Sequence, residues 1–286
     1  FKYKSLNKFK KFNNIVVIGM GGSILGAEAI YEFFKFKINK KIHFLNNIDI
    51  ELIENLKKEL SFKETLFLII SKSGSTIETI SNMLVLDIIK KNSKNILIIS
   101  EKNNFLHKIS KKYNLFFIDH KNYIGGRYSV LSEVGIVPAY LMDLQITRLR
   151  KNLNKFLKGN NKNFLKDSTV KLTSFLKQKK FNNLIFLNYS PKLEKFLNWM
   201  QQLIAESLGK KGFGFLPLIS NVPKDHHSLL QLYLDGPNDK IFYIFHSNEK
   251  YDKKIKTEKF FNEKNFLRNK TLCKIKKAQA NALIKT

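Results

Sequence analysis

The sequence predicts an α/β fold with two layered domains and mainly parallel sheets. Short apolar runs, as at residues 14–18 and 66–70, are each followed by a turn rich in glycine or serine and then by helical spacing. This alternation of strands and helices is typical of parallel, layered sheets. The length of 286 residues suits two domains, because one domain takes roughly 150 residues. A hydrophobic content of 43% that includes 25 Phe is sufficient for buried cores.

The charge of the chain does not predict a nucleic-acid partner. A net charge of +28 would normally suggest one, but 47 of the 51 basic residues are Lys and only four are Arg. Arg is the residue preferred for bidentate phosphate and base contacts. The lysines are also scattered, without the basic-aromatic interleaving or the recognition motifs of nucleic-acid-binding proteins.

Cysteine content and hydropathy predict a cytoplasmic protein. The single Cys273 excludes an internal disulfide and fits a reducing compartment. No apolar run approaches the roughly 18 residues of a membrane span. The chain starts at Phe1 rather than Met and stops at Thr286 inside a helical pattern. We therefore expect a piece of a longer protein that does not bind membranes.

The first strand is expected at residues 14–18, followed by Gly-Met-Gly-Gly-Ser at 19–23 and a helix at 24–34. A strand, a glycine turn and a helix in this order direct backbone N–H groups at an anion. The spacing matches neither the dinucleotide fingerprint nor the P-loop. An anion-binding loop and a purely structural tight turn both remain open.

The pattern recurs at residues 66–70, a strand that leads into Ser-Lys-Ser-Gly-Ser-Thr at 71–76 and a helix to residue 86. Ser75 and Glu78 have the spacing of a capping box, which would commit the Ser75 hydroxyl to the helix end. The remaining polar side chains of the loop are Ser71, Lys72, Ser73 and Thr76. Hydroxyls, amide N–H groups and the positive end of a helix together suit a phosphate dianion.

Two further strands are expected at residues 95–99 and 115–118, with a helix at 103–113 between them. Ligands of parallel α/β sheets bind at the carboxyl ends of the strands, where both loops lie.

A helix is expected from residue 130 to about residue 149, and the Asn/Lys-rich stretch 151–166 follows it. We place the domain boundary there. The predicted domains are residues 1–150, with the phosphate-binding loops, and residues 151–286.

The segment 123–129, Tyr-Ile-Gly-Gly-Arg-Tyr-Ser, contains Arg127, one of only four arginines. Paired glycines let a backbone approach closely and leave the guanidinium available to a ligand. A turn with a surface arginine is the alternative.

The second half begins with a strand at residues 183–187 and a helix opened by Ser-Pro at 190–191, where proline is permitted. Gln202 and Glu206 are four residues apart and share a face of this helix. The apolar face opposite is formed by Leu193, Phe196, Leu197, Met200, Leu203 and Ile204. Periodicity leaves open whether the polar face meets solvent or a cleft.

Downstream, we expect extended structure at 216–219, a helix at 228–234 and a strand at 240–245. The adjacent His226 and His227 do not predict a metal site. Neighbouring side chains diverge, and no His, Cys or carboxylate cluster supplies the other ligands at the usual spacing. A covalent hydrolase is disfavoured, because the Gly-x-Ser-x-Gly elbow is missing.

Taken together, these segments resemble those of the glucose-6-phosphate isomerase family. Members of this family contain two three-layer SIS (sugar isomerase) domains. The matching segments are residues 19–26, 71–79, 125–132, 202–210 and 225–228. They occur in the family's order. The Gly-Gly-Arg-Tyr-Ser and Glu-Ser-x-Gly-Lys segments are the most specific.

The resemblance implies a role for each matching position. The phosphate-binding positions would be Gly22, Ser23, Ser71, Ser73, Ser75 and Thr76. Lys72 would lie near the phosphate, and Gln202 would line the sugar. Glu206 would carry a proton between C1 and C2 through a cis-enediol, and Arg127 would stabilise the developing enediolate.

His227, rather than His226, matches the family histidine that helps to open the sugar ring. In the family this histidine reaches into the neighbouring subunit's site, which implies a homodimer. The implied reaction, a step of glycolysis and gluconeogenesis, needs a carboxylate that moves a proton and a fixed cation beside the developing charge. It needs no metal and no redox cofactor.

There are two departures from the family pattern. Residues 73–76 read Ser-Gly-Ser-Thr where the family commonly has Thr-Phe-Thr-Thr, which keeps the hydroxyls. The family's C-terminal segment, with a ring-opening lysine, has no counterpart before Thr286. We expect truncation to explain the second departure.

Two alternatives to this isomerase remain open. A SIS-domain sensor of sugar phosphates would keep the serine loops but would not need Glu206, Arg127 and His227 together. An isomerase that also accepts mannose 6-phosphate would differ only in pocket shape.

Overall fold

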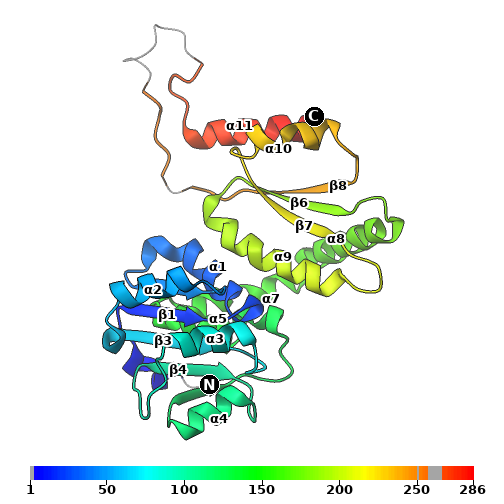
Figure 1. Ribbon diagram of the computed structural model, residues 1–286. Helices are drawn as coiled ribbons and strands as arrows, with labels where there is room; N and C mark the ends of the chain where they lie inside the picture. Colours follow the sequence, from blue (N-terminus) through cyan, green and yellow to red (C-terminus); the bar gives the residue numbers. More distant parts are fainter. Residues whose placement is uncertain (1–2, 250, 257–265) are drawn as a thin grey trace. The chain divides into compact units, whose positions relative to one another are not determined.

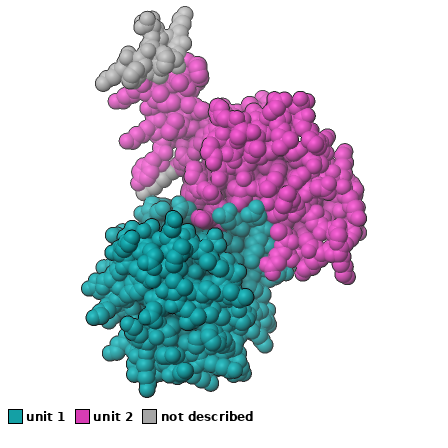
Figure 2. Space-filling model, in the orientation of Figure 1, with its two compact units in different colours: residues 1–170, 198–203 teal, residues 171–197, 204–286 magenta. Residues whose placement is uncertain are grey.

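The computed structural model describes residues 3–249, 251–256 and 266–286. The chain divides into two compact units, which Figure 2 colours separately. Unit 1 comprises residues 1–170 and 198–203, and unit 2 comprises residues 171–197 and 204–286. The predicted domain boundary at residue 150 stays a prediction. Within the described ranges, no helix has both the length and the apolar content that a bilayer crossing requires.

Unit 1 contains a five-stranded sheet in the order β2-β1-β3-β4-β5, in which all neighbouring strands are parallel (Figure 1). The strands are β1 (Asn14–Ile18), β2 (Lys41–Leu45), β3 (Thr65–Ile70), β4 (Ile96–Ser100) and β5 (Phe116–Asp119). β3 is buried along its whole length. Continuous apolar runs of this kind are typical of parallel strands that are covered on both faces.

Helices cover both faces of this sheet and complete three layers. The helices of unit 1 up to residue 150 are α1 (Leu25–Phe34), α2 (Ile50–Glu59), α3 (Ile77–Val85), α4 (Phe105–Lys112), α5 (Glu133–Leu141) and α6 (Ile146–Arg150). Short 3₁₀ segments are η1 (Tyr3–Phe9), η2 (Gly21–Ser23), η3 (Lys35–Lys37), η4 (Phe62–Glu64) and η5 (Gly126–Leu131). Tyr31 of α1 and Val137 of α5 pack into the core on one face. Ile53 of α2, Met83 of α3 and Leu106 of α4 belong to the core on the other face.

The expected strands of unit 1 and its expected helices up to residue 113 are confirmed, but β2 and α2 were not predicted. β2 has the sequence Lys-Ile-His-Phe-Leu and lies at the edge of the sheet, where only its Ile and Leu are buried. An edge strand needs fewer apolar residues than a central strand, so it leaves a weaker pattern. α2 begins after Asp49, whose side chain accepts a hydrogen bond from the Leu52 N–H, and it buries only two residues.

The single helix expected from residue 130 to about residue 149 is wrong. η5, α5 and α6 occupy this stretch as separate elements. α5 ends before Asp143, whose φ of 62° is left-handed. Such a residue terminates a helix, and the Asp143 carboxylate is held 2.9 Å from the Lys10 ammonium.

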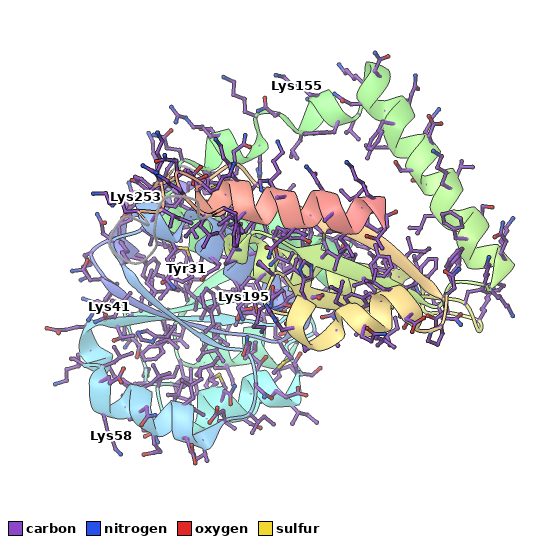
Figure 3. The ribbon with its side chains drawn as sticks, turned by 90° about the horizontal axis from the view of Figure 1, so that it is seen from above. Tyr31, Lys41, Lys58, Lys155, Lys195 and Lys253 are labelled. Atoms are coloured by element: carbon purple, nitrogen blue, oxygen red, sulfur yellow. The ribbon has the colours of Figure 1, made fainter. Side chains whose placement is uncertain are left out.

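The Asn/Lys-rich stretch 151–166 contains α7 (Leu153–Phe156) and the beginning of α8 (Gly159–Gln178). α8 has no buried residue. The polar composition of this stretch therefore accompanies exposed helices. Lysines such as Lys58 and Lys155 point away from the ribbon in Figure 3.

Unit 2 contains a three-stranded parallel sheet in the order β7-β6-β8. Its elements are β6 (Asn183–Asn188), η6 (Pro191–Leu193), α9 (Glu194–Leu208), β7 (Leu216–Asn221), α10 (His226–Asp235), β8 (Lys240–Phe245) and α11 (Leu272–Lys285). The central strand β6 is buried from its second residue onward. Tyr189 after β6, Tyr233 of α10 and Ala280 of α11 form part of its core. α9 has residues in both units, because residues 198–203 belong to unit 1.

Candidate active site

The loops after β1 and β3 lie at the carboxyl edge of the unit 1 sheet, as predicted. β1 and β3 are parallel neighbours. A Cβ atom placed on Gly19 would lie 3.0 Å from the Ile70 carbonyl oxygen, so the two loops touch where they leave the sheet. Ligands of parallel α/β sheets bind at this edge.

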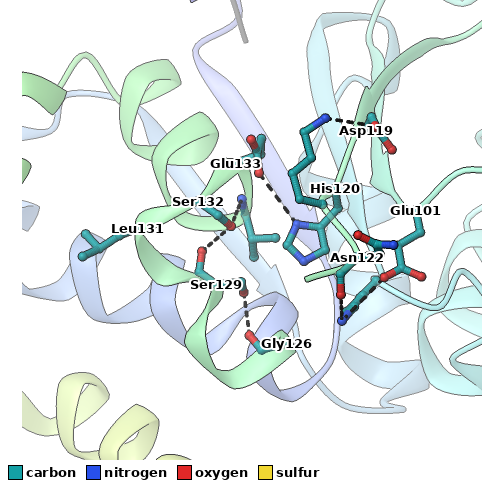
Figure 4. Close-up of polar contacts among 12 residues, drawn as sticks. Glu101, Asp119, His120, Asn122, Gly126, Ser129, Leu131, Ser132 and Glu133 are labelled. Atoms are coloured by element: carbon teal, nitrogen blue, oxygen red, sulfur yellow. Dashed lines mark hydrogen bonds and ion pairs between the residues drawn. The ribbon is translucent and has the colours of Figure 1, made fainter. Parts of the chain in front are cut away.

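Gly22 lets the first loop pack directly against the backbone that carries Arg127. A Cβ atom on Gly22 would lie 2.4 Å from the Gly126 carbonyl carbon and 2.6 Å from the Arg127 nitrogen. The buried Ser129 hydroxyl is 2.6 Å from the Gly126 carbonyl oxygen and 3.1 Å from that of Gly22. Figure 4 shows the Ser129–Gly126 contact. Two segments that are a hundred residues apart in sequence therefore form one surface.

The part of α9 that belongs to unit 1 joins this surface. The Trp199 indole N–H donates to the Arg127 carbonyl oxygen at 3.0 Å. One turn later, the Gln202 amide nitrogen lies 2.9 Å from where a Cβ atom on Gly21 would be. Gly21 has a left-handed φ of 52°, a conformation that glycine adopts without strain. The guanidinium carbon of Arg127 lies 4.7 Å from the centre of the Tyr128 ring.

The hydroxyls of the 71–76 loop gather at the start of α3. The Ser71 and Thr76 side-chain oxygens are 2.9 Å apart, and the Ser73 and Thr76 oxygens are 3.5 Å apart. The Ser71 oxygen accepts a hydrogen bond from the Gly74 N–H at 3.1 Å. The loop therefore gathers three hydroxyls beside a helix N-terminus, those of the exposed Ser73, the half-buried Thr76 and the buried Ser71. Such an arrangement suits an anion.

The capping box expected between Ser75 and Glu78 is wrong. Thr76, with extended backbone angles, is the N-cap residue of α3 and makes no side-chain capping bond. Glu78 is therefore the second residue of the helix, one position too early to complete the box. The exposed Ser75 hydroxyl donates to the Ser73 hydroxyl at 3.2 Å instead.

Two supporting residues of this loop were missed by sequence analysis. The Ser100 hydroxyl donates to the Ser71 carbonyl oxygen at 2.6 Å. The Asn104 amide donates to the Ser100 hydroxyl at 2.7 Å and to the Lys72 carbonyl oxygen at 3.3 Å. Asn104 also caps α4, by accepting a hydrogen bond from the His107 N–H at 3.0 Å. Its position before a helix predicts the cap, but only the folded structure reveals the contacts with the loop.

Replacing Asn104 with alanine should loosen the loop and destabilise unit 1. A lost N-cap costs about 1 kcal/mol, and the Ser100 hydroxyl would also lose its hydrogen-bond donor. We expect the free energy of unfolding, measured with urea, to fall by about 2 kcal/mol in total. The control is Asn163→Ala at an exposed position of α8, which should leave stability nearly unchanged. Equal effects at the two positions would contradict a supporting role for Asn104.

The Lys72 side chain contacts two other residues of the chain, Asn122 and Glu101. Its ammonium donates to the Asn122 carbonyl oxygen at 3.1 Å and lies 3.5 Å from the Glu101 carboxylate. Both partners appear in Figure 4. These contacts tie the 71–76 loop to the segment that leads to Arg127, so Lys72 connects two parts of the site.

The buried His120 and the half-buried Glu133 form a pair at the two ends of the segment that contains Arg127. The His120 side chain is 1% exposed, and its Nδ1 atom is 3.7 Å from a Glu133 carboxylate oxygen (Figure 4). Burial lowers the pKa of His120, and the nearby Glu133 partly opposes this effect. Sequence analysis missed this pair, because a single histidine after a strand carries no pattern.

Four wholly or partly buried histidines should make the protein less stable in mild acid. Burial lowers the pKa values of His43, His107, His120 and His226. The unfolded chain, in which the histidine pKa is about 6.5, binds protons at a pH where the folded protein does not. Protons therefore favour unfolding, and stability falls as the pH decreases through about 6.5.

Urea unfolding at about pH 7.5 and about pH 5.5 tests this expectation. The urea concentration at the midpoint of unfolding should be lower at the lower pH, and this decrease should be smaller in the His120→Gln variant. The exposed His246 provides the control, since His246→Gln should retain the full decrease. A midpoint that does not change with pH would contradict the expectation.

The remaining predicted residues belong to unit 2. Glu206 is exposed and lies one helical turn after Gln202, so the two share a face of α9. α9 ends at Leu208, and the Gly209 N–H donates to the Ala205 carbonyl oxygen at 2.9 Å.

The structure distinguishes the two adjacent histidines. The His226 Nε2 atom is 3.1 Å from the hydroxyl of Tyr189, which is fully buried. His227, the second residue of α10, is exposed. Asp225 anchors this turn by accepting a hydrogen bond from the Asn221 N–H at 2.7 Å. His226 therefore has a structural partner. Among the residues that the structure describes, no group of three or more His, Cys, Asp or Glu could hold a metal ion.

Comparison with known proteins identifies the family. The family model described as "Phosphoglucose isomerase" matches residues 3–213. The glucose-6-phosphate isomerase of Methanocaldococcus jannaschii is 36% identical over 271 residues, which cover 92% of this chain and 67% of that protein. The chain thus spans about two thirds of the length of this relative.

Solved structures agree in fold. A hypothetical protein of Thermus thermophilus superimposes with a TM-score of 0.83 at 26% identity, covering 98% of this chain and 71% of that one. A glucose-6-phosphate isomerase of Chlamydia trachomatis superimposes with a TM-score of 0.70 at 20% identity. The match covers 96% of this chain and 56% of that one. These likenesses confirm the predicted SIS-type α/β fold. The family match extends over more than half of the chain, and the chain therefore belongs to the phosphoglucose isomerase family.

Proposed function

We propose that the protein containing this chain interconverts glucose 6-phosphate and fructose 6-phosphate, in glycolysis and gluconeogenesis. The observation that supports this most strongly is the packing of Gly22 against Gly126 and Arg127, with Gln202 beside Gly21. Three segments that the family resemblance singles out meet there. A sensor of sugar phosphates would not need an arginine and a glutamine at this position.

The phosphate of the substrate binds at the 71–76 loop. The clustered hydroxyls of Ser71, Ser73 and Thr76 donate to its oxygens, and the N-terminus of α3 adds favourable electrostatics. Ser75 and the Gly22–Ser23 turn contribute further polar groups at the same edge of the sheet. Binding a remote phosphate fixes the position of the reacting carbons.

Glu206 is the base of the reaction. Its carboxylate removes the proton from C2 of the open-chain aldose and returns a proton to C1, through a cis-enediol. Arg127 offsets the negative charge that develops on the enediolate oxygen. Gln202, one turn before Glu206 on the same face of α9, contacts the sugar hydroxyls.

His227 assists opening of the sugar ring, while His226 remains hydrogen-bonded to the Tyr189 hydroxyl. We also propose a cytoplasmic homodimer in which His227 serves the neighbouring subunit's site. Light scattering coupled to size-exclusion chromatography tests the dimer, which would be rejected by a monomeric mass at assay concentrations.

The proposed function is tested by a coupled assay on the full-length protein. Glucose 6-phosphate formed from fructose 6-phosphate is measured through NADP⁺ reduction by glucose-6-phosphate dehydrogenase, in parallel with mannose 6-phosphate as a second substrate. Turnover with fructose 6-phosphate alone supports the proposal, and turnover with both sugars indicates the broader isomerase. Tight binding of fructose 6-phosphate without turnover would establish the sensor instead.

A further inference from the structure

A cavity in unit 1 lies at the opposite edge of the sheet from the loops described above. It has a volume of about 480 Å³. It is lined by Lys8, Phe9, Lys11, Asn92, Ser93, Lys94, Asn114, Leu115 and Phe116. These residues lie at the end of η1, in the segments that lead into β1, β4 and β5, or at the start of β5. Because the strands are parallel, the cavity lies at their amino ends, away from the proposed isomerase residues of unit 1.

The charge around this cavity has one sign. Three of the lining residues are lysines, and no lining residue is acidic. Among the described residues, Lys8, Lys11 and Lys94 form no ion pair, whereas the neighbouring Lys10 lies 2.9 Å from the Asp143 carboxylate. Three like charges around a small volume repel one another. A bound anion would remove this repulsion.

The walls of the cavity are fixed by the fold. Asn92 and Asn114 both have a left-handed backbone, with φ values of 61° and 52°. The Asn114 amide donates to the Asn92 side-chain oxygen at 2.8 Å, which joins the two turns. The floor is apolar, since Phe9 is 1% exposed and the Lys8 ammonium lies 4.3 Å from the centre of the Phe116 ring. The lysines thus surround a preformed hollow.

We infer that this cavity binds a small polyanion, a molecule with two or more negative charges such as a diphosphate or a tricarboxylate. Its volume is within the range of about 300–1,000 Å³ that is usual for small-molecule sites. A singly charged anion would leave two of the three ammonium groups uncompensated. The inference does not depend on the proposed isomerase activity.

Isothermal titration calorimetry with inorganic pyrophosphate and with citrate, at constant ionic strength, tests the site. The triple variant Lys8→Gln/Lys11→Gln/Lys94→Gln removes its charge. The matched control Lys162→Gln/Lys166→Gln/Lys171→Gln removes the same charge from exposed positions of α8. Lys94→Glu is a second variant, because Lys94 is exposed and its replacement disturbs no packing.

We expect the triple variant and Lys94→Glu each to raise the Kd by about tenfold or more, and the control to change it by less than about twofold. Saturating fructose 6-phosphate should leave pyrophosphate binding unchanged. Preference for one of the two probes identifies the ligand as phosphorylated or carboxylated. Equal losses in the two triple variants would attribute binding to net charge alone and overturn the inference. Absence of binding, or displacement by fructose 6-phosphate, would overturn it as well.

Discussion

Replacing Glu206 with glutamine should reduce kcat for fructose 6-phosphate by roughly 10²- to 10⁴-fold, the usual contribution of a general base. Glutamine has nearly the same shape but does not accept the proton. Because Glu206 is exposed at the end of α9, the change should leave the fold intact. KM should change only a few-fold, since we propose that the substrate is bound mainly through its phosphate, at the 71–76 loop. Steady-state kinetics of the full-length protein measures both constants.

The control for this variant is Glu194→Gln, an exposed acid in the first turn of the same helix. It removes the same charge from α9 without removing the proposed base, so kcat should remain close to that of the unchanged protein. If Glu206→Gln kept full turnover, another residue would be the base. Equal losses in the two variants would point to the charge of the helix rather than to proton transfer.

Gly22→Ala should strongly damage the proposed site. The added Cβ atom would lie 2.4 Å from the Gly126 carbonyl carbon, so one backbone segment must move. Displacing a catalytic group by about 1 Å can cost roughly 10²-fold in rate. We expect kcat/KM to fall by about that factor, and overpacking to cost about 1–3 kcal/mol of stability.

Gly126→Ala is a matched control from the other side of the same contact. A Cβ atom on Gly126 would meet no atom within 4 Å. This variant should therefore retain nearly full activity and stability. Comparable losses in Gly22→Ala and Gly126→Ala would contradict the packing described for the two loops.

Much of the fold was predictable because it depends on local patterns. β1, β3 and β4 are apolar runs, the first two with glycine or serine turns after them, and their boundaries differ from the expected ones by at most one residue. The edge strand β2 and the capping register of α3 were not predictable in this way. The first depends on a neighbouring strand, and the second on which residue adopts extended backbone angles at the helix start.

The candidate site, like the fold, has some features that local sequence patterns predict and others that they do not. The shared face of Gln202 and Glu206 follows from helical spacing, and the hydroxyl cluster follows from the composition of its loop. The Trp199–Arg127 hydrogen bond and the His120–Glu133 pair join segments that are distant in sequence. No local pattern encodes such contacts, so only the folded structure reveals them.

The central claim, isomerisation by proton transfer through an enediol, is tested most directly by NMR in D₂O. The full-length protein is incubated with fructose 6-phosphate, and the hydrogens at C1 of the ketose and C2 of the aldose are followed as the sugars interconvert. Glucose 6-phosphate should form and deuterium should accumulate at these carbons, at rates that fall together in Glu206→Gln. Interconversion that is equally fast in Glu206→Gln, or no interconversion at all, would contradict the account.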